Sequence, residues 1–147
     1  MPFYVKVKGS FPGKHYWPEA PERFQELGKL HEHVFHFVVE IRVVYPREIE
    51  FLEVAQQITQ RLSRHLQDHP DLSCEEMARD LFDDFAEGWA APVGAGRVIY
   101  TEVNEDGGCG AIYRLSRGEE LHYSHVLHVE VPTAPFDPPK TSDGGGD

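Results

Sequence analysis

Three histidines near the start of the chain have the residue type and spacing of a metal site. His31 and His33 lie two residues apart, and in a β-strand residues two apart project from the same face. Two imidazoles on one strand face can bind one metal ion, and His15 approaches them if the first two strands pair. Three histidine ligands with one open coordination position are typical of catalytic zinc. Alternating histidines also occur on solvated strand faces, so both interpretations stay open.

The cysteines and the other histidines give weaker signals. Cys74 and Cys109 form no CxxC pair, and in a reducing compartment both are expected to be free thiols. Cys74 has the position of a helix-start residue, and Cys109 lies in a glycine-rich turn. His36 has the opposite strand parity to His33 and is expected on the other strand face. Three further histidines lie near the end of the chain, and their role stays open: His122, His125 and His128.

The elements that must position these side chains follow from hydrophobic periodicity. Apolar residues at steps of three and four predict two helices, the first with a buried stripe that begins at Phe51, and Ser73 is a good N-cap for the second. The stretch 9–28 contains glycines and prolines and is expected to be a long loop, or a loop with a short helix near 21–26. The predicted strands are 3–8, 34–44, 97–103, 111–115 and 120–131, and the first helix is 48–66.

The order strand, strand, helix, helix, strand, strand predicts an α+β fold. Two helices can cover only one face of a four-stranded antiparallel sheet, so the other face and the sheet edges remain exposed. Joining the sheets of several subunits into a closed barrel would cover both. We therefore expect a homo-oligomer.

Composition narrows the class of protein. The chain has 147 residues, enough for one domain, which we place at 1–131, with a Pro-, Gly- and Asp-rich tail at 132–147. The formal net charge of −11 makes nucleic acid and anionic membranes unfavourable partners. The sequence contains neither an apolar stretch that could cross a membrane nor the apolar segment of a signal peptide, so a cytoplasmic location is expected.

Several motifs together resemble the 6-pyruvoyltetrahydropterin synthase and 6-carboxytetrahydropterin synthase family. That family has a histidine in its first hairpin, an HGH motif at the start of the second strand, and a pterin-binding glutamate before the last matched strand. The resemblance covers roughly residues 3–116 and follows the family's order. The matching segments are 15–22 (HYWPEAPE), 27–33 (LGKLHEH), 47–51 (REIEF), 73–78 (SCEEMA), 103–105 (VNE) and 112–113 (IY).

The resemblance implies a tunnelling fold, a ββααββ unit that assembles into an oligomeric barrel with active sites between subunits. It implies that His15, His31 and His33 bind zinc. Glu105 would bind the amino and ring N–H groups of a pterin-like ring, because a carboxylate accepts two parallel N–H bonds from a guanidine-like edge. Glu102 is a competing anchor, but the spacing from Glu105 to the following strand matches the family without gaps.

The chain departs from the family at its proton-transfer residues. Family enzymes carry a cysteine just before the histidine pair, where this chain has Leu27. A glutamate replaces that cysteine in part of the family, and Glu26 lies one position out of register with it. The family's Asp–His dyad aligns with residues 63–64, so Asp68 and His69 are the candidate replacement, with a solvated helix end as the alternative. In such a dyad the carboxylate fixes the imidazole tautomer.

Two functions therefore stay in competition, beside a third alternative, an oligomeric scaffold with only a structural metal. The first is a zinc-dependent lyase that acts on a pterin-type or 7-deazapurine-pathway compound. The second is a tunnelling-fold protein that binds or senses a purine- or pterin-like molecule without the family's usual turnover. The predicted metal set favours the enzyme, and Leu27 at the cysteine position favours the binding protein.

Overall fold

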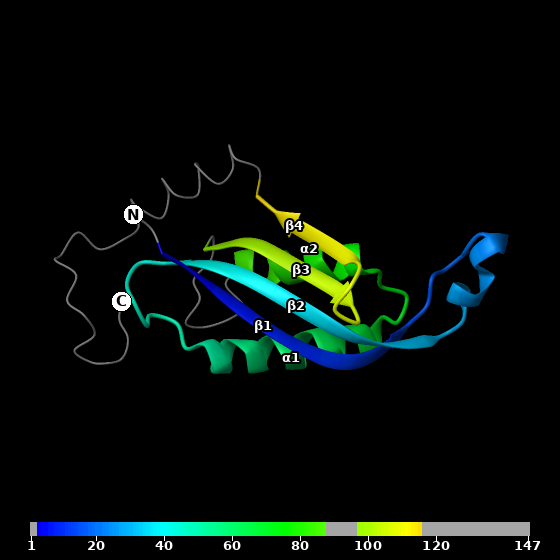
Figure 1. Cartoon of the computed structure of the whole chain (residues 1–147), viewed down its shortest axis with the longest axis horizontal. Helices are drawn as coiled ribbons and strands as arrows, with labels where there is room; N and C mark the ends of the chain where they lie inside the picture. The colour runs from blue at the N-terminus through cyan, green and yellow to red at the C-terminus, as the bar shows by residue number, and fades with distance from the viewer. Residues whose placement is uncertain (1–2, 88–96, 116–147) are drawn as a thin grey trace.

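A four-stranded antiparallel sheet in the order β1-β2-β3-β4 forms one layer of the protein, and two helices cover one of its faces (Figure 1). The computed structural model describes residues 3–87 and 97–115. The predicted α+β architecture is confirmed within these residues. The elements are β1 (Phe3–His15), the 3₁₀ helix η1 (Glu22–Gly28), β2 (His31–Val43), α1 (Phe51–Asp68), α2 (Cys74–Ala86), β3 (Val98–Glu105) and β4 (Gly110–Arg114).

Some predictions fall outside the described residues. They concern the strand at 120–131, the tail at 132–147 and the three histidines between positions 122 and 128. Within residues 3–87 and 97–115, no helix is long and apolar enough to span a membrane.

The first strand is twice as long as its sequence suggested. The prediction of an irregular segment from residue 9 is wrong up to His15, because β1 pairs with β2 along its whole length, from Phe3 opposite Val43 to His15 opposite His31. The glycines that suggested a loop make room for the core instead. A Cβ on Gly9 would lie 2.4 Å from Cζ of Phe37, whose ring is fully buried against the strand.

The core lies between the sheet and the helices. Alternate residues of β2 from Phe35 to Val43 are buried under α1 and α2, while the residues between them face the other side of the sheet. The buried stripe of α1 begins at Val54, so the prediction that Phe51 belongs to it is wrong. Phe51 is 52% exposed at the start of the helix, and Ile49 from the preceding connection is buried in the core instead.

Two local features fix the segments beside the histidines. Ser73 caps α2 as predicted, in a capping box with Glu76 that satisfies a backbone N–H of each residue. β3 runs two residues further than predicted, to Glu105, and a tight turn then leads into β4. Asp106 begins that turn with φ 57°, a left-handed conformation that aspartate tolerates better than most residues.

A test of the long first strand is the substitution Gly9→Ala. The added Cβ collides with the buried Phe37 ring, so we expect the free energy of unfolding to fall by about 1–3 kcal/mol. Urea denaturation followed by circular dichroism measures it. Gly28→Ala is the matched control, because the nearest atom to its added Cβ is the backbone oxygen of Trp17 at 3.4 Å. Equal losses in the two variants would contradict the packing of Phe37 over Gly9.

Candidate metal centre

His15, His31 and His33 come together at one end of the sheet. His15 is the last residue of β1 and lies opposite His31, the first residue of β2. All three share the parity of the buried residues of their strands, so they lie on the helix-covered face. One ligand atom from each histidine lies within 4.8 Å of the others, and the three could hold a metal ion.

Each imidazole is oriented by an oxygen that accepts a hydrogen bond from Nδ1. In this tautomer Nε2 carries the lone pair, which is the state that ligates a metal. Two acceptors are backbone carbonyls and the third is a carboxylate. The Nδ1–oxygen distances are 2.9 Å from His15 to Leu72 O, 2.8 Å from His31 to Lys29 O and 2.8 Å from His33 to Asp106 Oδ2.

Asp106 is itself fixed by the start of β2. Its second carboxylate oxygen accepts the backbone N–H of Val34 at 2.9 Å. The hydrogen bonds from Val34 and His33 hold the pKa of Asp106 below its usual value, so it stays an acceptor. Because Val34 follows His33, one carboxylate fixes both the backbone and the side chain of this part of the strand.

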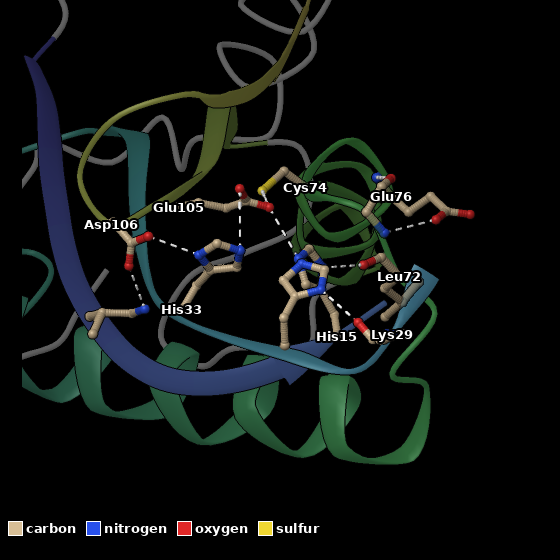
Figure 2. Close-up of polar contacts among 11 residues, drawn as sticks. His15, Lys29, His33, Leu72, Cys74, Glu76, Glu105 and Asp106 are labelled. Atoms are coloured by element: carbon tan, nitrogen blue, oxygen red, sulfur yellow. Dashed lines mark hydrogen bonds and ion pairs between the residues drawn. The ribbon is translucent and has the colours of Figure 1, made fainter. Parts of the chain in front are cut away.

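Glu105 faces the same cluster from the end of β3 (Figure 2). Its Oε2 lies 3.1 Å from Nε2 of His15, and its Oε1 lies 3.6 Å from Nε2 of His33. Nε2 of His15 is buried and has no hydrogen-bond partner within the described part of the chain. Lone pairs and a carboxylate therefore converge without a proton between them, an arrangement that a cation stabilises.

The candidate ligands line a pocket of about 740 Å³. Trp17 and Leu27, from the connection between β1 and β2, form part of its wall, and a backbone hydrogen bond of 2.8 Å joins the two residues. Leu27 thus lines the pocket with an apolar side chain. Cys74 and Cys109 line it as well.

Cys74 stays protonated in this wall. The pKa of its thiol is raised to about 12, mainly by burial and to a lesser extent by the negative charges of Glu105 and Glu75. Its Sγ lies 4.0 Å from Oε2 of Glu105 and donates toward it. Sequence reasoning gave Cys74 no chemistry, because its proximity to Glu105 depends on how α2 packs on β3.

The predicted catalytic residues do not gather at this pocket. Glu26 is exposed and forms an ion pair with Lys29 at 3.1 Å. Within the described residues, no hydrogen bond or ion pair joins Asp68 to His69, and neither lines the pocket. Glu102, the competing anchor, lies on the opposite face of β3 from Glu105.

Glu102 already has hydrogen-bond partners on that opposite face. It accepts hydrogen bonds from the hydroxyl of Tyr100 at 2.7 Å and from Nδ2 of Asn104 at 2.9 Å. A ligand bound beside the three histidines therefore meets Glu105 and not Glu102.

A different Asp–His pair joins the two helices. Nε2 of His65 in α1 donates to Asp80 in α2 at 2.9 Å. Burial alone would raise the pKa of Asp80, but hydrogen bonds from His65 and Arg79 outweigh it and hold the pKa below its usual value. The ring of His69 lies 5.3 Å from that of His65. Sequence reasoning missed this pair, because only the packing of the helices brings the two residues together.

Comparisons with known proteins do not assign the chain. No protein-family model matches it, and a search of curated proteins finds no relative.

The two thiols of the pocket should differ in reactivity. At a pH of about 8 a thiol with a pKa of about 12 is protonated, and the thiolate is the reactive form. We expect iodoacetamide to modify the exposed Cys109 of the metal-free protein and to leave Cys74 unmodified, as measured by peptide mass spectrometry. Cys109→Ser should then leave the chain unlabelled. Similar labelling rates for the two residues would contradict this view of the pocket.

Proposed function

We propose that this chain is a zinc-binding protein of the 6-pyruvoyltetrahydropterin and 6-carboxytetrahydropterin synthase type. Its pocket would take a pterin-like or 7-deazapurine-pathway compound. One observation carries the proposal. Three histidines whose Nε2 atoms are free to bind a metal lie together with Glu105 in one pocket. Three imidazole nitrogens are a common donor set of catalytic zinc.

The tunnelling fold and its oligomeric barrel belong to the same proposal. The ββααββ order supports it, as do edge strands β1 and β4, whose outer sides have no partner strand among the described residues. The middle of the sheet face that no helix covers is polar, with Lys6 opposite Glu40. Such a face suits the water-filled interior of a barrel. Sedimentation of the full chain at micromolar concentration tests assembly, and a stable monomer would contradict it.

The residues of the pocket suggest how the ligand is held. Zinc, when bound, would lower the pKa of a coordinated water or polarise a carbonyl or hydroxyl of the substrate side chain. Glu105 would accept two N–H bonds from the guanidine-like edge of the ring. Trp17 and Leu27 would cover the ring and exclude water. Asp106 would keep His33 in its ligating tautomer.

One observation favours the second candidate, a protein that binds such a ligand without the family's turnover. Leu27 can neither accept nor donate a proton, and Glu26 is turned to solvent beside Lys29. Proton transfer would then require a group such as Cys109 in the pocket, or a pair such as His65 and Asp80 from a neighbouring subunit.

The metal is tested by replacing two of its ligands. We expect the purified full chain to contain about one zinc per chain and the His31→Ala, His33→Ala double variant to contain almost none, as measured by elemental analysis. Zinc should also leave the wild type in acid, because imidazole must be neutral to ligate. His36→Ala, on the opposite strand face, is the control and should keep its zinc. Equal zinc in the wild type and the double variant would overturn the proposal.

The ligand is tested by calorimetric titration of neopterin, pterin and guanine. Glu105→Gln should weaken binding by about 2–4 kcal/mol, because the ring's donors lose a charged acceptor. Glu102→Gln is the control, and both variants are compared at equal zinc content. If Glu102→Gln abolishes binding and Glu105→Gln does not, the anchor is wrongly assigned. Turnover of dihydroneopterin triphosphate would support the enzyme, and binding without turnover would support the second candidate.

A further inference from the structure

Both carboxylate oxygens of Glu105 face the candidate metal ligands. Its two carboxylate oxygens lie 3.1 Å and 3.6 Å from Nε2 of His15 and His33. Neither contact is a hydrogen bond in the tautomer that the Nδ1 contacts fix, because Nε2 then has no proton to donate. Nε2 of His15 is correspondingly left without a hydrogen-bond partner in the described chain.

These separations are close to those of ligands on a shared ion, although each is made by a different carboxylate oxygen. Zinc bonds of about 2.0–2.1 Å place the ligand atoms of a tetrahedron about 3.3–3.4 Å apart. The two distances from Glu105 lie on either side of this value. The histidine nitrogens, at up to 4.8 Å from one another, would move together by up to about 1.4 Å around an ion, and Glu105, which lies outside this group of three, would move in with them.

The turn after β3 aims two neighbouring carboxylates at one imidazole. Figure 2 shows His33 between Asp106, which accepts from its Nδ1, and Glu105, which faces its Nε2. Glu105 is held in the ladder through its backbone N–H, which donates to Cys109 O at 2.9 Å. The left-handed φ of 57° at Asp106 lets the chain turn directly after Glu105.

We infer that Glu105 is the fourth ligand of the metal when the pocket holds no organic molecule. This inference rests on the proposed function, since it requires the three-histidine site. Glu105 would then have two alternative partners, the metal and the guanidine-like edge of a ligand. A compound that takes the carboxylate would open a coordination position on the metal beside itself. The resting site would be closed, as in structural zinc sites, and would open only with the ligand.

Cobalt binding to the full chain, freed of metal, tests this with the metal alone. The visible spectrum of Co²⁺ reports its coordination number and the types of its ligands, and its affinity reports how much each protein ligand contributes. We expect wild type to give the spectrum of a four-coordinate site. Glu105→Gln should give a shifted spectrum, because another ligand such as water takes the place of the carboxylate, and should bind cobalt at least about tenfold less tightly. Glu32→Gln is the matched control. Glu32 lies between His31 and His33 in the sequence but on the opposite face of the sheet, so its loss removes an equal charge and should leave the spectrum and the cobalt affinity as in wild type.

The outcomes separate this inference from the proposed function. If Glu105→Gln keeps the wild-type spectrum and affinity while the His31→Ala, His33→Ala variant binds no cobalt, the fourth-ligand role is wrong and the three-histidine site stands. If the double histidine variant binds cobalt as wild type does, the site itself is wrong. If Glu32→Gln weakens cobalt binding as much as Glu105→Gln does, the loss of affinity reflects net charge and the inference fails. Circular dichroism confirms that each variant is folded.

Discussion

The uninterrupted antiparallel pairing of β1 with β2 is the constraint on which the candidate site depends. It brings His15, from a stretch rich in glycine and proline, directly opposite His31. The pairing survives these residues because Gly9 leaves space for the Phe37 ring, and because Pro12 lies in an edge strand, where a missing N–H is tolerated. The same core packing that stabilises the sheet therefore sets the backbone positions of all three histidines, since His33 lies opposite Gly13 in the same ladder.

The orientation of the histidine rings and of the carboxylates depends on a second layer of contacts. His15 is tied to the connection between the helices through Leu72, and His33 is tied to the turn after β3 through Asp106. Hydrogen-bond acceptors are concentrated where these segments meet, and Glu105 adds a negative charge beside them. A bound cation would offset the repulsion within such a cluster, so under the proposed metal binding the occupancy of the site and the stability of the fold would be linked.

The sequence predicted what local periodicity controls. The parity of His31 and His33, the N-cap at Ser73 and the α+β order all follow from residues a few positions apart. Prediction from the sequence failed where contacts between residues far apart in the sequence determine the structure. The extension of β1 depends on rings in β2, and the exposure of Phe51 depends on Ile49 entering the core. The proximity of Cys74 to Glu105 depends on helix packing, for which the sequence carries no local signal.

The hairpin register also divides the chain into parts with different tolerance to changes in length. Inserting or deleting one residue within β1 would turn His15 to the opposite face of the sheet and remove it from the cluster. Residues 18–26 lie beyond the hydrogen bond between Trp17 and Leu27 and take no part in the strand ladder. This end of the hairpin can lengthen or shorten while the histidines keep their register. The shape of the pocket wall can therefore diverge in evolution while the three histidines keep their places.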